Sequence, residues 1–158
     1  MWCALGRYGG ALRHLLLRQR PQPEPALLHA LAALLHGSCA SAVEGTLLLP
    51  IPSWKRRANP LPALLAEGLV RASAGRCCLA GALLRRNRPA VGQHHLNRRQ
   101  RLCNQQGVFH CSSPGRGAIW LVDDILTTGA TAGAAAAALE ASGWAVQGVL
   151  CAARTPRR

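Results

Sequence analysis

The chain alternates between two patterns of apolar residues. Short continuous apolar runs, typical of strands buried on both faces of a sheet, occur at residues 45–49, 77–84, 119–122 and 144–153. Apolar residues recur at helical spacing in residues 5–20, 26–36, 61–71 and 132–142. Strands that alternate with helices predict an α/β fold, with a parallel sheet flanked by helices and preceded by an N-terminal helical segment.

Acidic and small polar residues directly follow the apolar run at 119–122. Asp123 and Asp124 come first and carry two of the six negative charges of the chain. A loop of threonine and glycine follows at residues 127–131, just before the helix predicted at 132–142. Strand, acidic pair, small-residue loop and helix therefore occur in the order expected of a phosphate site.

This order suits a ligand that carries a phosphate, a diol and a metal ion. Backbone N–H groups of a threonine and glycine loop can converge on an anion, which the positive end of the following helix also favours. Carboxylates accept hydrogen bonds from sugar hydroxyls or ligate a divalent cation. Phosphoribosyl pyrophosphate has all three features. The alternative is a buried strand with an acid-capped turn. A P-loop is disfavoured, because the chain lacks Gly-x-x-x-x-Gly-Lys-Ser/Thr.

The eleven residues 121–131, Leu-Val-Asp-Asp-Ile-Leu-Thr-Thr-Gly-Ala-Thr, resemble the phosphoribosyl pyrophosphate motif of type I phosphoribosyltransferases. The resemblance implies the fold of that family. It also implies that Asp123 and Asp124 hold the ribose hydroxyls, directly or through Mg²⁺ and water. The residues implied to cradle the 5′-phosphate are Thr127, Thr128, Gly129, Ala130 and Thr131.

A second anion-binding loop is predicted after the strand at 45–49. Pro50 and Pro52 end that strand, and three adjacent cations, Lys55, Arg56 and Arg57, follow. A basic loop at a strand end suits a pyrophosphate group. The segment resembles the pyrophosphate loop of the same family, although Arg57-Ala58-Asn59-Pro60 replaces its Arg-Gly-Phe-Asn-Gln-like run. The alternative is an ordinary solvated charge run.

Two further segments resemble ComF-type proteins, a branch of the superfamily associated with bacterial DNA uptake. Residues 8–16, Tyr-Gly-Gly-Ala-Leu-Arg-His-Leu-Leu, resemble the segment that opens the phosphoribosyltransferase part. The ComF-type signature Gln-x-x-Leu-x-x-x-x-Arg-x-x-Asn-x-x-Gly-x-Phe is matched by Gln93, Leu96, Arg101, Asn104, Gly107 and Phe109. The resemblance implies a flexible loop here that closes over the site, with Gln93, Arg101 and Asn104 as candidate site residues. The zinc ribbon usual in that family has no counterpart in this sequence, so we expect a ComF-type chain without the metal module.

Length and composition support a single domain. At 158 residues the chain can bury a core, and we expect an N-terminal helical segment at 1–44 and a ligand-binding α/β core at 45–158. No apolar run is long enough for a membrane helix and no signal-peptide core is visible, so we predict a cytoplasmic protein. Seven cysteines without a Cys-x-x-Cys spacing are interpreted as small buried residues in a reducing compartment.

The formal net charge of +13 indicates polyanionic partners or compositional bias on a solvated surface. The partners considered are phosphoribosyl pyrophosphate with Mg²⁺, single-stranded DNA or a DNA-uptake machinery, and a second copy of the chain. Three functions therefore stay open: a ComF-type accessory that keeps the ligand site, an active phosphoribosyltransferase with an unknown acceptor, and a basic nucleic-acid-binding protein with a relic site. No residue can be assigned as a catalytic base.

Overall fold

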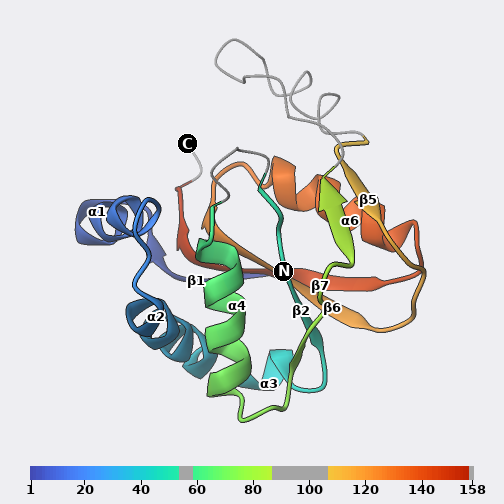
Figure 1. Cartoon of the computed structure of the whole chain (residues 1–158), viewed down its shortest axis with the longest axis horizontal. Coiled ribbons are helices and arrows are strands. Elements are labelled where there is room, and N and C mark those ends of the chain that lie inside the picture. The colour runs from blue at the N-terminus through green and yellow to red at the C-terminus, as the bar shows by residue number, and fades with distance from the viewer. Residues whose placement is uncertain (54–58, 87–106, 157–158) are drawn as a thin grey trace.

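The computed structural model describes residues 1–53, 59–86 and 107–156 (Figure 1). The elements in chain order are β1 (Trp2–Arg7), α1 (Gly10–Gln19), α2 (Pro25–Gly37), α3 (Ala40–Val43), β2 (Leu47–Pro50), α4 (Leu61–Ala72), β3 (Cys78–Leu79), β4 (Leu84–Arg86), β5 (Phe109–Cys111), β6 (Ala118–Leu126), α6 (Ala130–Glu140) and β7 (Ala145–Arg154). No helix in these described ranges is both long and apolar enough to cross a bilayer.

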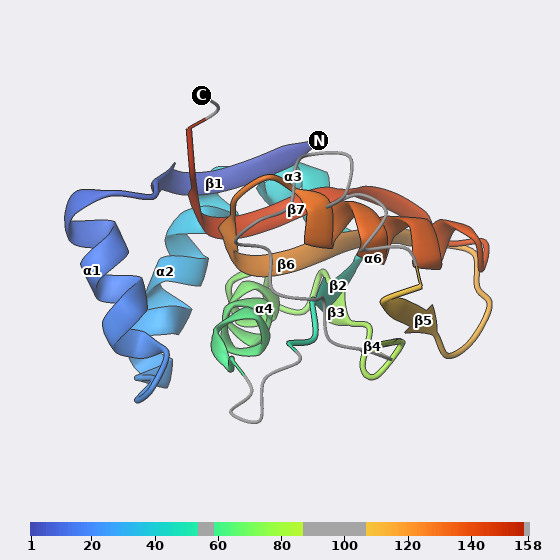
Figure 2. The same cartoon turned by 90° about the horizontal axis from the view of Figure 1, so that it is seen from above.

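The main sheet has five strands in the order β1-β7-β6-β2-β3, and every pair of neighbours is parallel. Strands β4 and β5 form a separate antiparallel pair. Helices α1, α2 and α4 group together, apart from α6, in both views (Figures 1 and 2). The predicted parallel α/β fold, with helices on both faces of the sheet, is therefore confirmed. Parallel strands end at one common edge, where loops of such folds bind ligands.

Strand β6 is buried on both faces, as its continuous apolar run predicts. Trp120 and Val122 belong to the core beneath α2 and α4, whereas Ile119 and Leu121 belong to the core beneath α6. This alternation follows from the two-residue period of a strand. The indole N–H of Trp120 donates to the carbonyl of Ala42 at 2.9 Å, so the large side chain is buried with its one polar group satisfied.

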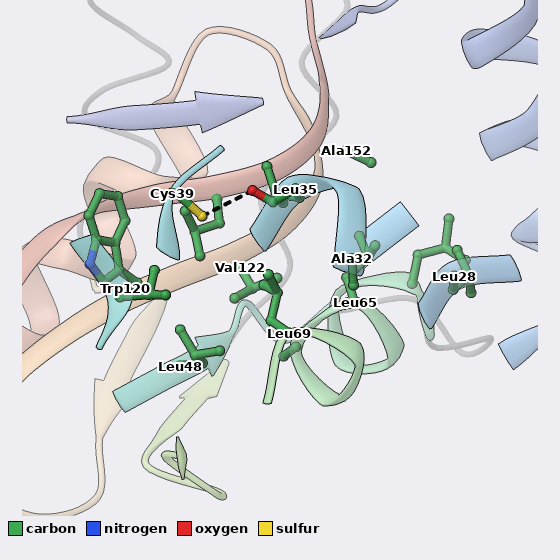
Figure 3. Close-up of a cluster of buried hydrophobic side chains, with 14 of the residues drawn as sticks. Leu28, Ala32, Leu35, Cys39, Leu48, Leu65, Leu69, Trp120, Val122 and Ala152 are labelled. Atoms are coloured by element: carbon green, nitrogen blue, oxygen red, sulfur yellow. Dashed lines mark hydrogen bonds between the residues drawn. The ribbon is translucent and has the colours of Figure 1, made fainter. Parts of the chain in front are cut away.

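The larger core lies between the sheet and the helices α2 and α4 (Figure 3). Leu28, Ala32 and Leu35 on α2 recur at helical spacing and are fully buried. They pack with Leu65 and Leu69 of α4 on the residues of β2, β6 and β7 below. The predicted helices at 26–36 and 61–71 are thus confirmed, and the face that each buries is the apolar face of its sequence.

The structure corrects the prediction for the N-terminus. Residues 2–7 form the edge strand β1 instead of the first turns of a helix, and α1 begins only at Gly10. The extended backbone of Gly9 (φ −173°) and the positive φ of Gly10 (+48°) separate strand from helix. Strand β1 pairs with β7, so the predicted N-terminal helical segment also contributes a strand to the main sheet.

The predicted strand at 77–84 is also corrected. Its residues divide into β3, which pairs with β2 in the main sheet, and β4, which pairs with β5. Gly81 adopts a positive φ of +56° between them, which glycine takes without strain. The continuous apolar run at 77–84 therefore contributes residues to two different sheets.

We predict that Gly68 is required for close packing of α4 on α2. A Cβ at this position would lie 2.6 Å from the Cβ of Ala32 and 2.9 Å from the Cα of His29. Gly68→Ala should lower the free energy of unfolding by about 1–3 kcal/mol, because an extra methyl group in a packed core forces the helices apart. Urea denaturation measures this. Gly37→Ala is the matched control, because a Cβ there meets nothing within 4 Å; equal stability of the two variants would contradict the prediction.

Candidate functional site

The site residues predicted in the motif at 121–131 lie at the carboxyl edge of the sheet. Asp123 and Asp124 lie near the carboxyl end of strand β6, and the segment 127–129 connects β6 to α6. Thr127 and Thr128 are exposed, whereas Gly129, Ala130 and Thr131 are half-buried. A single strand–loop–helix unit therefore brings the acidic pair next to the small-residue loop.

The loop leads directly into the N-terminus of α6. Gly129 is the N-cap and adopts the left-handed conformation, with φ +78° and ψ 2°. Its carbonyl accepts the N–H of Gly133 at 2.8 Å, and Thr128 Oγ1 accepts the N–H of Ala130 at 3.3 Å. The first turn of the helix contains no acidic residue. Its remaining N–H groups are thus available to an anion, which the helix dipole favours.

The carboxylate of Asp124 is buried and fully engaged by protein groups. Its Oδ2 accepts three hydrogen bonds: from Arg20 Nε at 3.0 Å, from Arg20 Nη2 at 2.8 Å and from Asn59 Nδ2 at 3.0 Å. Its Oδ1 accepts the backbone N–H of Ile125 at 2.9 Å. Asp124 therefore joins α1, the loop before α4 and β6, instead of presenting a free oxygen to the loop at 127–129.

Asp123 has a different environment. Among the described residues it accepts one hydrogen bond, at Oδ1 from the backbone N–H of Asp124 at 2.9 Å. Burial and the adjacent negative charge of Asp124 raise the pKa of Asp123 from 3.8 to about 8, although Arg20 partly opposes the shift. Asp123 is the member of the acidic pair that has capacity left for a hydroxyl group or a cation.

A Mg²⁺ ion shared with a ligand fits this donor set. Mg²⁺ favours oxygen donors and is held by one or two carboxylates together with substrate phosphates and water. Asp123 supplies such a carboxylate, and a bound cation would offset the cost of its ionisation. In the described part of the chain no three His, Cys, Asp or Glu side chains cluster as a metal site.

Three residues missed by the sequence-based assignment also belong to this neighbourhood. Arg20 and Asn59 contact Asp124 from segments that are 104 and 65 residues away in the sequence. Arg86, at the end of β4, lies near Asp123, and its guanidinium stands 5.3 Å from the ring centre of Phe109. Burial lowers the pKa of Arg86, and the charge of Asp123 opposes this shift. Two sequence signals were available: Asn59 is the residue of Arg57-Ala58-Asn59-Pro60 that matches the Arg-Gly-Phe-Asn-Gln-like run, and the doublet Arg85-Arg86 precedes a polar stretch.

The other predicted site residues fall outside the described residues. These are Lys55, Arg56 and Arg57 of the pyrophosphate-loop candidate, and Gln93, Arg101 and Asn104 of the flexible-loop candidate. Their flanking residues are described: the N–H of Asn59 donates to Ser53 Oγ at 2.9 Å, which joins the two ends of the first loop. The ends of the second loop belong to β4 and β5, which pair with each other.

A cavity of about 840 Å³ borders the other side of the loop at 127–129. It extends along α6 and β7, and its lining includes Thr128, Gly129, Ala136 and Arg154. The acidic pair does not line it. Residues 127–129 therefore line a cavity of mixed polar and apolar character that neither aspartate lines.

Comparisons with known proteins give matches among solved structures. No family model matches the chain, and no curated protein does. Among solved structures, adenine phosphoribosyltransferase from Leishmania tarentolae is similar over 90% of this chain and 74% of that chain, with 19% sequence identity and a TM-score of 0.48. A likeness at this level does not assign a ligand, so the functional proposal depends on the site itself.

The raised pKa of Asp123 predicts that the free energy of unfolding decreases as the pH rises and Asp123 loses its proton. Between about pH 4 and pH 8 the folded state retains a proton that the unfolded state has released, so stability falls across this range. Asp123→Asn removes the titration, and its stability relative to wild type should increase from pH 4 to pH 8. Thermal unfolding across this range measures the difference. Glu140→Gln, at the exposed end of α6, is the control; a pH-independent effect of Asp123→Asn would contradict the assignment.

The left-handed conformation of Gly129 predicts a specific need for glycine. A β-branched residue at φ +78° is strained, and it would alter the approach of the loop to an anion. We expect Gly129→Val to abolish binding of phosphoribosyl pyrophosphate while the circular dichroism spectrum stays close to wild type. Gly133→Val, one turn further along α6, is the matched control, because a Cβ there meets nothing within 4 Å. Normal binding by Gly129→Val would place the phosphate elsewhere.

Proposed function

We propose that this chain is a ComF-type, phosphoribosyltransferase-like protein that binds phosphoribosyl pyrophosphate together with Mg²⁺. One observation carries the proposal: a half-buried carboxyl with hydrogen-bonding capacity left, Asp123, lies next to a glycine-capped helix N-terminus at the carboxyl edge of a parallel sheet. The ligand offers a matching group to each part. Its 5′-phosphate suits the N–H groups of the loop, and its ribose hydroxyls and metal suit the carboxylate.

The roles of the individual residues follow from this arrangement. Asp123 binds the ribose hydroxyls or the ligand-bound Mg²⁺, and the segment 127–131 surrounds the 5′-phosphate. Lys55, Arg56 and Arg57 neutralise the pyrophosphate group, as their sequence resemblance implies. A Mg²⁺ ion held by Asp123 together with the ligand would supply positive charge to the pyrophosphate, and so would favour pyrophosphate as the leaving group when a nucleophile attacks the anomeric carbon. If the protein is an active transferase, its own contribution is positioning and charge stabilisation.

The connection to competence is supported by the ComF-type signature at 93–109 and by the net charge of +13. On this basis we assign the protein to the cytoplasm and to DNA uptake. Nucleic-acid binding with a relic ligand site is the second candidate. It is supported by the guanidinium of Arg154, which lies 3.6 Å from the ring centre of the exposed Trp2, because arginine and tryptophan together suit phosphates and bases.

Calorimetry with phosphoribosyl pyrophosphate, with and without Mg²⁺, tests the proposal. We expect Mg²⁺-dependent binding that Asp123→Asn weakens at least tenfold, or about 1.4 kcal/mol, since the variant keeps the volume of the side chain but loses its charge. Glu140→Gln removes the same charge from the far end of α6 and should bind as wild type does.

Two outcomes would contradict the proposal. Equal affinities of wild type and Asp123→Asn would remove the acid from the ligand site. Failure of the wild-type protein to bind the ligand, combined with binding of single-stranded DNA that persists at physiological salt, would favour the nucleic-acid function instead.

A further inference from the structure

Arg20 reaches the candidate site from the N-terminal part of the chain. It is the C-cap residue of α1, and its guanidinium forms an ion pair with Asp124, 104 residues away, at 2.8 Å. The corner that carries it is fixed, because the buried Gln19 accepts the backbone N–H of Glu24 through its Oε1 at 2.6 Å. The position of Arg20 is therefore determined both by its helix and by its carboxylate partner.

The ion pair uses only part of the guanidinium. Nε and Nη2 both donate to one oxygen, Oδ2 of Asp124, while Oδ1 accepts the N–H of Ile125. A guanidinium has five N–H donors, so three have no partner among the described residues. The Arg20 side chain is 41% exposed, whereas that of Asp124 is 4% exposed. The guanidinium of Arg20 is thus held in place by Asp124, and its unused donors remain accessible to a ligand.

The neighbours of Arg20 indicate which part of a ligand it faces. Asn59 donates to the same oxygen of Asp124, so its amide and the guanidinium lie within 3.0 Å of a common atom. Asn59 closes the loop that begins at Ser53 and contains the three consecutive cations of the pyrophosphate-loop candidate. Arg20 is therefore next to Asn59, the described residue at which that loop ends.

We propose that Arg20 binds the pyrophosphate group of the ligand, and that Asp124 serves to orient Arg20 and not to hold ribose hydroxyls. This inference rests on the proposed function of the site. A guanidinium fixed on one side by a carboxylate can offer its other N–H groups to phosphate oxygens in a set geometry. Arg20 thereby joins the N-terminal helix α1 to ligand binding. The two carboxylates of the acidic pair then have different tasks, with Asp123 on the ribose or metal and Asp124 on a cation.

Binding of three ligands to Arg20 variants tests this division. We expect Arg20→Gln to weaken binding of inorganic pyrophosphate and of phosphoribosyl pyrophosphate at least tenfold, each measured with Mg²⁺ by calorimetry. Affinity for ribose 5-phosphate should stay within twofold, because that ligand lacks the pyrophosphate group. Glutamine can still donate a hydrogen bond to Asp124. The variant therefore separates a loss of anion binding from a loss of the contact between residue 20 and Asp124.

Two further variants complete the design. Arg20→Lys keeps the charge without the planar fork and should recover part of the pyrophosphate affinity. Arg18→Gln removes a charge from an exposed position of the same helix and should bind all three ligands as wild type does. Melting temperatures of all variants report whether the fold is retained.

The outcomes separate this inference from the proposed function. If Arg20→Gln binds pyrophosphate as wild type does, or loses affinity for all three ligands equally, the assignment of Arg20 is wrong. Both outcomes leave Mg²⁺-dependent binding of phosphoribosyl pyrophosphate by the wild type intact. If the wild type binds pyrophosphate through Arg20 but shows no Asp123-dependent binding of phosphoribosyl pyrophosphate, the proposed function fails and the anion site stands. Binding of neither ligand by the wild type overturns both.

Discussion

A carboxylate that is buried at the end of a buried strand has to be compensated by nearby donors, and Asp124 imposes this requirement on the whole carboxyl edge of the sheet. An unpaired charge in such a place would be costly. Arg20 and Asn59 provide the compensation from two segments that are distant in sequence. The N-terminal helix, the loop before α4 and the central strand β6 therefore meet at one oxygen atom. The candidate site lies where these three segments are joined.

The same requirement divides the acidic pair. Asp124 is compensated by protein groups, whereas burial and the adjacent negative charge of Asp124 together raise the pKa of Asp123 to about 8. Two adjacent, chemically identical residues thus acquire different properties from their surroundings. The resemblance to the phosphoribosyl pyrophosphate motif implies the same role, binding of the ribose hydroxyls, for both aspartates. The hydrogen bonds of this chain distinguish its members.

Much of this arrangement can be predicted from the sequence, because it depends on local patterns. The buried run that leads into Asp123, the glycine at 129 and the helix after it form one continuous segment, and the parallel sheet follows from alternating strands and helices. The strand β1 could not be predicted in this way, because the apolar spacing of residues 5–16 also fits a helix. The partners of Asp124 depend on the packing of α1 and α4 against the sheet, which no local pattern encodes.

The position of β1 has a consequence for the order of folding. Among the described residues this strand pairs in the main sheet with β7, and the ammonium group of Met1 donates to the carbonyl of Gln147, 146 residues away. Residues 2–7 pair with residues 149–154, so each residue and its partner are 147 positions apart in the sequence. Contacts between residues so far apart in sequence slow folding, because the chain between them loses conformational entropy before the contact contributes any stabilisation. The edge of the sheet is therefore completed late, and until then the backbone N–H and C=O groups of β1 lack their partners on β7.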